Sequence, residues 1–307
     1  MKVALIGGTG FVGVHLVERL IQDGHQPRLL VRPGSVSKVE RPADCEIVSG
    51  DLDQPGALDA CIAGSDAVVY LIGILREEPS RGITFEALQL HGVEKTIAAA
   101  RAQGVDRFLL MSANGVRHDG TPYQRTKFQA EESLKESGLR WTIFRPSVIF
   151  GEPRGRMELC SQLKHDIIDS PLPAPLFYPG LLPSGAGEFQ LAPVCVADVA
   201  AAFALALTDP GTLSQTYSLC GPERLSWKAM LSTIAAACGR SKWMLPAPAL
   251  AVSAVAGLLD RFPWFPITRD QLRMLLEGNV CHENDGFARL GLSPQHFRPE
   301  ALAYLRA

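Results

Sequence analysis

A tyrosine and a lysine four positions apart, Tyr123 and Lys127, are the side chains in this sequence with the clearest capacity for proton transfer. On a helix, residues at this spacing project from one face. A lysine cation one turn away lowers the pKa of a phenol, so Tyr123 could exchange a proton with a hydroxyl or carbonyl group. Lys127 could also hydrogen-bond the ribose of a nucleotide. An ordinary amphipathic helix can carry the same spacing by chance, so the surrounding elements must decide between these interpretations.

A glycine-rich turn near the start of the chain supplies that context. The apolar residues 3–6 predict a buried strand, glycines follow at once, and a helical pattern begins directly behind them. Gly7 allows a tight turn, Gly10 lets the backbone approach a pyrophosphate, and Gly13 lets the helix pack on the strand. The N–H groups at the start of the helix attract phosphates. The turn therefore predicts a dinucleotide site, with contacts at Gly7, Thr9, Gly10, Phe11, Val12 and Gly13.

The end of the second expected strand, residues 28–31, indicates which nucleotide binds. An acidic residue there would hydrogen-bond the 2′-hydroxyl of NAD, whereas an arginine accommodates the 2′-phosphate of NADP. The sequence has Arg32, and the first acidic residue after it is Glu40. We therefore expect NADP(H) to be preferred, with NAD(H) as the alternative cofactor. A solvated loop arginine is the competing interpretation of Arg32.

The remaining elements of this half of the chain alternate between strands and helices. We expect further strands at 46–50, 67–72, 107–111 and 141–144, with helices between them. Such alternation predicts an α/β fold with a Rossmann-type, doubly wound parallel sheet. Gly73, at the end of the fourth strand, would permit close approach of the backbone to a ligand.

The pattern changes after Gly151, which sets the expected domain organisation. Residues 1–150 are predicted to form an NAD(P)-binding domain whose sheet is completed by parts of 191–220. Residues 151–307 are predicted to form a smaller, mostly helical substrate-binding lobe and C-terminal helices. Within it, the uncharged stretch before Asp260 and the aromatic residues that follow suit a membrane surface or a protein partner, which makes peripheral contact through 242–266 one interpretation. A helix packed under the lobe explains the same composition and is slightly favoured, because two prolines shorten the helix.

Bulk properties limit the classes of partner and compartment. The chain has 307 residues, 47% of them hydrophobic, and a formal net charge of -2, which argues against nucleic-acid binding. The first strand begins at Lys2 and no run of about 18 apolar residues occurs, so neither a signal peptide nor a membrane-spanning helix is expected.

No His or Cys spacing suggests a metal site. Seven scattered cysteines predict reduced thiols and a cytoplasmic protein, with the inner face of a membrane as the alternative location. They are Cys45, Cys61, Cys160, Cys195, Cys220, Cys238 and Cys281.

These motifs together resemble an extended short-chain dehydrogenase/reductase of the NAD(P)-dependent epimerase/dehydratase type. The resemblance rests on the glycine turn, Asp51-Leu52, Tyr123-x3-Lys127 and residues 145–151, and it covers nearly the whole chain. Residues 266–271 and 291–305 are similar to the atypical branch that contains the nucleotide-binding accessory subunit of respiratory complex I. The resemblance implies further cofactor contacts at Asp51, Leu52, Leu71, Ile72 and Pro146, and catalytic roles for Tyr123, Lys127 and Ser112.

The sequence departs from the family at two positions of the catalytic tetrad. Ala113 falls at the serine position, Ser112 lies one residue earlier, and Gln89 occupies the position of the family's asparagine. Losing one such donor typically lowers the rate by about 10²–10³. Asn114 is a candidate substitute donor.

Two functions follow from these observations. The first is an NADP(H)-dependent oxidoreductase or epimerase/dehydratase that acts on an unknown small-molecule substrate, with Tyr123 as general acid/base assisted by Lys127. The second is a catalytically weak or inactive, nucleotide-bound structural or assembly factor associated with a respiratory membrane complex. Tyr123 and Lys127 favour the first hypothesis, whereas Ala113 and the segment 242–266 favour the second.

Overall fold

The computed structural model divides the chain into two compact units. The structure describes residues 1–180, 182–259, 267–281 and 286–306. Unit 1 consists of 1–146, 196–219 and the described part of 283–293. Unit 2 consists of the described parts of 147–195, 220–282 and 294–307.

Unit 1 is built on a parallel sheet with the strand order β11-β6-β5-β4-β1-β2-β3. Its strands are β1 (Lys2–Ile6), β2 (Gln26–Val31), β3 (Glu46–Ser49), β4 (Ala67–Tyr70), β5 (Arg107–Met111), β6 (Arg140–Pro146) and β11 (Gln215–Leu219). Six of these strands follow the order of a dinucleotide-binding sheet, and β11 extends it beside β6. The Rossmann-type fold predicted from the alternating pattern is confirmed.

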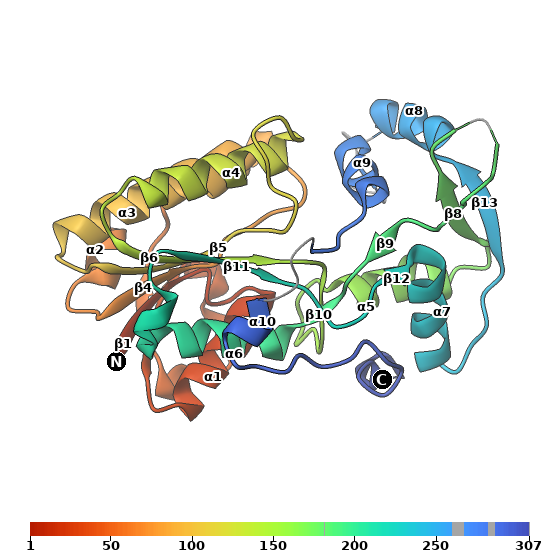
Figure 1. Cartoon of the computed structure of the whole chain (residues 1–307). Coiled ribbons are helices and arrows are strands. Elements are labelled where there is room, and N and C mark those ends of the chain that lie inside the picture. Colours follow the sequence, from red (N-terminus) through yellow and green to blue (C-terminus); the bar gives the residue numbers. More distant parts are fainter. Residues whose placement is uncertain (181, 260–266, 282–285, 307) are drawn as a thin grey trace. The chain divides into compact units, whose positions relative to one another are not determined.

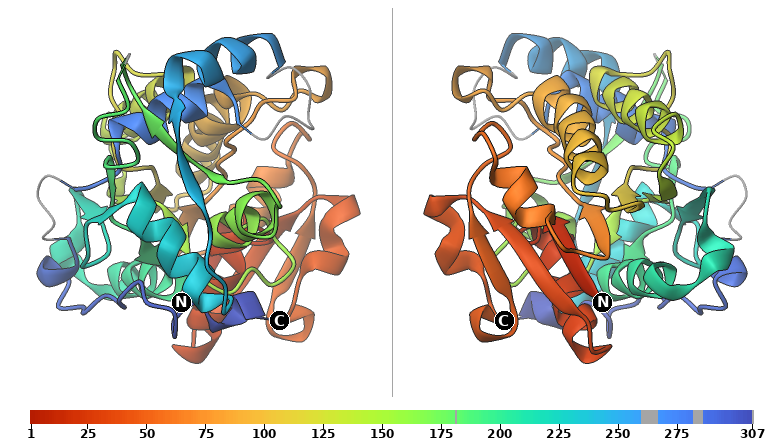
Figure 2. Two further views of the ribbon diagram at one scale, coloured as in Figure 1. Left: turned by 90° about the vertical axis from the view of Figure 1, so that its right-hand side faces the viewer. Right: turned by 90° about the vertical axis from the view of Figure 1, so that its left-hand side faces the viewer.

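Helices cover both faces of this sheet (Figure 1). On one face α1 (Phe11–Gln22) packs against α6 (Val196–Thr208), and α10 (Gly286–Arg289) contacts β11. On the other face α2 (Ala57–Ile62), α3 (Gly92–Ala102) and α4 (Pro122–Lys135) lie side by side, as the orange and olive ribbons of Figure 2 also show. Short helical segments complete unit 1 at Pro33–Lys38, Pro42–Asp44, Pro79–Arg81, Glu86–His91 and Pro210–Thr212. The sheet is therefore doubly wound, as predicted.

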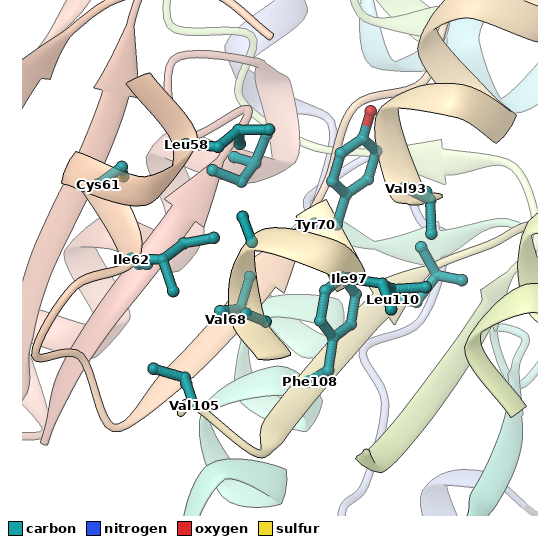
Figure 3. Close-up of a cluster of buried hydrophobic side chains, with 14 of the residues drawn as sticks. Leu58, Cys61, Ile62, Val68, Tyr70, Val93, Ile97, Val105, Phe108 and Leu110 are labelled. Carbon is teal, nitrogen blue, oxygen red and sulfur yellow. The ribbon is translucent and has the colours of Figure 1, made fainter. Parts of the chain in front are cut away.

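The core of unit 1 explains why β4 is apolar throughout. All four of its residues are buried, because helices cover it on both faces. Tyr70 lies under α3 with Val93 and Ile97, and Phe108 comes from the neighbouring strand (Figure 3). The Tyr70 hydroxyl donates a hydrogen bond to the Leu88 carbonyl at 2.5 Å. Burying each large apolar side chain of this kind stabilises the fold by about 1.5–3 kcal/mol.

Unit 2 contains more helix than strand, and its strands form three short pairs. Its helices are α5 (Leu159–Leu163), a π-helical turn (Lys164–Ile168), α7 (Trp227–Ala237), α8 (Ala249–Leu259), α9 (Arg269–Glu277) and a 3₁₀ turn (Ala303–Arg306). The strand pairs are β7 (Ile149–Phe150) with β10 (Val194–Cys195), β9 (Gln190–Leu191) with β12 (Leu225–Ser226), and β8 (Ala174–Tyr178) with β13 (Met244–Pro248). The amino-acid pattern does not predict the β8–β13 pair, because prolines within both segments mask the strand signal.

A disulfide corrects the expectation that every cysteine is reduced. Cys220 and Cys281, both in unit 2, are bonded, with their Cα atoms 6.0 Å apart. They are separated by 61 residues, and the fold rather than a local motif brings them together. A spacing-based prediction therefore had no signal for this pair. The other five cysteines are not disulfide-bonded.

The uncharged stretch before Asp260 forms β13 and α8. The aromatic residues 261–266, which the sequence analysis singled out, lie outside the described residues. Within the part of the chain that is described, no helix combines the length and the apolar composition that crossing a membrane requires.

Candidate functional site: the carboxyl edge of the unit 1 sheet

Parallel pairing brings the predicted site residues to one edge of the sheet, because all carboxyl ends of its strands lie there. The glycine turn follows β1, Arg32 follows β2, Asp51 lies beyond β3, Gly73 follows β4, Ser112 follows β5, and Pro146 ends β6. Ligands of open α/β sheets bind at this edge. The elements thus bring together positions that are up to 139 residues apart in the sequence, from Gly7 to Pro146.

The glycine turn has the tight geometry that its sequence predicts. Gly7 has a φ of +99°, and its carbonyl accepts a hydrogen bond from the Gly10 N–H at 3.1 Å. A Cβ on Gly13 would lie 2.4 Å from the Gly7 oxygen, so only glycine lets α1 pack this closely. Gly10 is the N-cap of α1 and makes no side-chain cap, and a Cβ there would meet only the Gly7 oxygen, at 3.3 Å. The N–H groups of the first turn of α1 are therefore suited to receive an anion.

This geometry predicts different outcomes for two glycine substitutions. Gly10→Val should leave the fold intact but obstruct the approach of the pyrophosphate. Loss of one or two charge-assisted hydrogen bonds, each worth about 1.5–3 kcal/mol, would weaken NADPH binding by at least roughly tenfold. Gly13→Ala should instead overpack the contact between α1 and the turn and lower the free energy of unfolding by about 1–3 kcal/mol. Fluorescence titration and thermal unfolding of both variants separate the effects, and unchanged NADPH affinity in Gly10→Val would contradict the assignment of the turn.

The carboxyl end of β2 is followed by an exposed arginine. Arg32 directly follows β2 and is the N-cap of the 3₁₀ segment Pro33–Lys38. Its carbonyl accepts a hydrogen bond from the Ser35 N–H at 2.7 Å, which shapes the turn. The Asp51 carboxylate accepts from the Leu52 N–H at 2.7 Å, within its own turn.

The remaining predicted cofactor contacts are more enclosed. Val12, Leu52, Leu71 and Pro146 are buried, whereas Thr9, Phe11 and Ile72 are half-buried. A Cβ on Gly7 would lie 3.0 Å from Ile72 Cγ1, so the end of β4 directly adjoins the glycine turn. The cofactor contacts of these residues stay predictions.

The helix that carries the tyrosine and lysine starts at a well-defined cap. Thr121 and Gln124 form a capping box, in which the Gln124 N–H donates to the Thr121 hydroxyl and the Gln124 side chain accepts from the Thr121 N–H. Pro122 occupies the first helical position, which suits its fixed φ. Tyr123 consequently lies in the first turn of α4, and Lys127 lies one turn later.

Burial controls the pKa of both groups. The half-buried Tyr123 ring contacts Phe85 edge to face, with ring centroids 5.7 Å apart, and burial raises the pKa of Tyr123 to about 12. Lys127 is 4% exposed and burial lowers its pKa to about 8, while the charge of Glu131 acts in the opposite direction. The expectation that Lys127 lowers the phenol pKa is therefore wrong. Desolvation dominates at Tyr123, and the Lys127 ammonium donates a hydrogen bond to the Met111 carbonyl at 2.9 Å.

Lys127 also reaches the end of β4. Its Nζ lies 3.4 Å from the position that a Cβ on Gly73 would occupy. Lys127 thus lies where the ends of β4 and β5 meet α4.

Ser112 is engaged by a buried carboxylate. It is 3% exposed, and its hydroxyl donates to Glu131 Oε1 at 2.5 Å while its N–H donates to the Phe144 carbonyl at 2.8 Å. Ala113, the next residue, is half-buried. The catalytic role of Ser112 stays a prediction, and donation of its hydroxyl proton to a substrate would compete with the bond to Glu131.

Two further residues at this edge emerge with roles that the sequence analysis did not assign. Gln89, in the π-helical segment Glu86–His91, donates to the Ile74 carbonyl at 2.8 Å and accepts from the Thr126 hydroxyl at 3.2 Å. It therefore ties the loop after β4 to α4. Glu131 binds Ser112 and Arg145. In the sequence, only its position four residues after Lys127 indicates that it could lie near the site.

Comparison with known proteins agrees with this architecture. A family model described as NAD(P)H-binding matches residues 7–167. Ceramide reductase from Caulobacter vibrioides is 35% identical over 150 residues, 48% of this chain and 46% of that protein. The mitochondrial NADH-ubiquinone oxidoreductase 40 kDa subunit of Neurospora crassa is 24% identical over 99% of this chain and 78% of that protein. NAD(P)H azoreductase from Xenophilus azovorans is 27% identical over 78% of this chain and 74% of that protein. The chain thus matches less than half of the ceramide reductase and about three quarters of the other two.

Solved structures share the fold. UDP-glucose 4-epimerase from Thermotoga maritima superposes with a TM-score of 0.72 at 17% identity and covers 100% of this chain and 97% of its own. A short-chain dehydrogenase/reductase superfamily protein from Agrobacterium tumefaciens with bound NAD gives a TM-score of 0.61 at 21% identity, over 81% of this chain and 86% of its own. The chain therefore belongs to the NAD(P)H-binding family, and its resemblance to atypical extended short-chain dehydrogenases/reductases, with the complex I subunit among its relatives, is confirmed.

Proposed function

We propose that this protein is an NADP(H)-dependent oxidoreductase in which Tyr123 is the general acid/base and Lys127 binds the ribose. The observation that carries the proposal is the arrangement of α4. It sets Tyr123 in its first turn and Lys127 one turn later, with the ammonium against the ends of β4 and β5. An epimerase or dehydratase would use the same pair of residues. Two relatives are named as reductases, a ceramide reductase and an NAD(P)H azoreductase, which favours reduction.

The residues on this edge would divide the work of such a reaction. A bound nicotinamide nucleotide would supply the hydride. Tyr123, neutral near pH 7 because its pKa is raised to about 12, would donate its phenolic proton to the oxygen that gains charge. Lys127, with a pKa of about 8, is cationic below that pH and would hydrogen-bond the ribose hydroxyls. The glycine turn would receive the pyrophosphate on backbone N–H groups, with Gly10 allowing the approach.

Cofactor choice tests the adenosine end of the proposal. Arg32 should contact the 2′-phosphate, so NADPH should bind more tightly than NADH by roughly 10- to 100-fold, because one charge-assisted hydrogen bond is worth about 1.5–3 kcal/mol. Arg32→Ala should remove most of this preference and leave NADH affinity unchanged. Arg41→Ala is the matched control, since Arg41 is an exposed arginine in the same region that pairs with Asp44 at 2.8 Å. Calorimetric titration of the three proteins measures the effect, and equal affinities for the two nucleotides in the parent would refute the assignment.

A second candidate function is that of a nucleotide-bound structural subunit or assembly factor. Unit 2 exposes Trp243, Leu245 and Leu250 at 85%, 58% and 65%, beside the uncharged helix α8. An exposed apolar surface of this kind favours contact with another protein or with a membrane. The relative from NADH-ubiquinone oxidoreductase makes a respiratory complex the candidate partner. Under this hypothesis the nucleotide stabilises the fold, and loss of the Tyr123 hydroxyl has no effect on any measurable property.

A further inference from the structure

A buried carboxylate lies one helical turn beyond Lys127. Glu131, on α4, is 0% exposed. It accepts a hydrogen bond from the Ser112 hydroxyl at 2.5 Å and two from the Arg145 guanidinium, at 2.8 Å from Nε and 2.5 Å from Nη2. Burying a carboxylate without partners would be strongly unfavourable, and these three hydrogen bonds offset that cost.

Two consecutive turns of α4 hold two consecutive residues at the end of β5. Lys127 binds the Met111 carbonyl, and Glu131 binds the Ser112 hydroxyl. Ser112 is tied in turn to β6 through the Phe144 carbonyl, and Arg145 comes from the same strand. Glu131 therefore joins three elements at the edge where the cofactor would bind, and it fixes the register of α4 against β5.

The groups around Lys127 come from three elements, and the charge of Glu131 is the one among them that favours its ammonium. From α4, Glu131 and the neutral phenol of Tyr123 lie one turn to either side of it. From β5 it meets the Met111 carbonyl, and from the end of β4 it meets Gly73. Glu131 itself forms ion pairs with two cations, Arg145 from β6 and, at 3.8 Å, Lys135 from α4. Burial disfavours the ammonium of Lys127, and the charge of Glu131 favours it.

We propose that Glu131 is a positioning residue of the nucleotide site. Through Ser112 and Arg145 it fixes α4 against β5 and β6, which places Lys127 for the ribose, and its charge favours the Lys127 ammonium. This inference rests on the proposed role of Lys127 in NADP(H) binding. It also assigns Ser112 to the support of the site, because its hydroxyl is already donated to Glu131.

The test replaces the carboxylate and measures the charge of Lys127. In Glu131→Gln the titration midpoint of the Lys127 side chain, followed by ¹⁵N NMR in the free protein, should fall by about one pH unit. The affinity for NADPH should then be parent-like at pH 6, where the amine is protonated in both proteins, and roughly tenfold weaker at pH 8.5. The matched control is Glu132→Gln, the neighbouring exposed carboxylate that pairs with Lys135 at 2.7 Å, and it should change neither quantity.

The outcomes separate a positioning role from a structural one. An equal loss of affinity at pH 6 and pH 8.5, or an unchanged Lys127 titration, overturns the proposal. Glu131→Asp keeps the charge and should give the same Lys127 titration midpoint as the parent. If the Gln variant does not fold, the Asp variant tests the proposal instead. A lowered Lys127 midpoint in the Asp variant would then overturn it. Failure of every protein, including the parent, to bind NADPH would contradict the proposed function, whereas the NMR comparison would still decide the role of Glu131.

Discussion

Replacing Tyr123 with Phe should lower turnover by about 10²–10⁴, the usual contribution of a positioned general acid/base, and leave NADPH affinity within about twofold. The substitution removes only the hydroxyl, so the ring still contacts Phe85 edge to face. The measurement is NADPH oxidation with a panel of carbonyl compounds, followed by titration of the nucleotide alone. The expected pattern is a loss of kcat with little change in cofactor binding.

The same variant separates the two candidate functions. If the protein is a structural nucleotide binder, Tyr123→Phe should match the parent in stability, nucleotide affinity and any partner interaction. Tyr178→Phe is the matched control, because it makes the same chemical change on β8 of unit 2. A parent-like rate for Tyr123→Phe with a turned-over substrate would exclude Tyr123 as the acid/base.

The sequence predicts the architecture of unit 1 because its signals are local. The apolar run that becomes β4, the glycine turn and the capping box at Thr121 each determine structure within a few residues. The parallel order of the sheet then carries Arg32 and Gly73 to one edge without further information. Most of the candidate site therefore follows from the order of elements.

The features that the sequence analysis missed depend on contacts between distant segments. Glu131 looks like one more acidic residue of a charged helix, and its burial arises from Ser112 and Arg145 on two other elements. The Cys220–Cys281 bond likewise depends on the fold, which brings together two cysteines that are 61 residues apart in the sequence. The direction of the Tyr123 pKa shift is missed for a related reason. The spacing of four residues shows that a lysine is near the phenol, but it does not show that burial desolvates the phenol and raises its pKa.

The second large effect concerns Lys127, whose substitution by Met should weaken binding and stabilise the fold together. Loss of the ribose contact should lower NADPH affinity by roughly 10- to 100-fold, the equivalent of a charge-assisted hydrogen bond of about 1.5–3 kcal/mol. Methionine has a similar length and no charge, so it fits a site that is 4% exposed in the parent. Removing the desolvated ammonium should raise the free energy of unfolding at pH 7 by about 3 kcal/mol. A residue retained for function at the expense of stability behaves in this way.

The stability difference between Lys127→Met and the parent should depend on pH. The pKa of Lys127 falls from an ordinary value of 10.5 to about 8 on folding, so between these values the unfolded chain binds more protons than the native protein. The stability that this group contributes to the parent therefore rises with pH across that window. The advantage of Lys127→Met should be full below about pH 8 and should disappear as the pH approaches 10.5. Tyr123 titrates in both proteins and cancels in the difference.

Urea unfolding of the parent and the variant at pH 7 and pH 10 measures this difference. Lys95→Met is the matched control, because Lys95 is exposed on α3 and pairs with Asp53 at the surface. Its effect should stay within about 0.5 kcal/mol at both pH values, as is usual for surface substitutions. If Lys127→Met were instead less stable than the parent at pH 7, the bonds made by the ammonium to Met111 and its attraction to Glu131 would outweigh its desolvation. Lys127 would then be a residue that stabilises the fold through those contacts, and its position at the edge of the sheet would not indicate nucleotide binding.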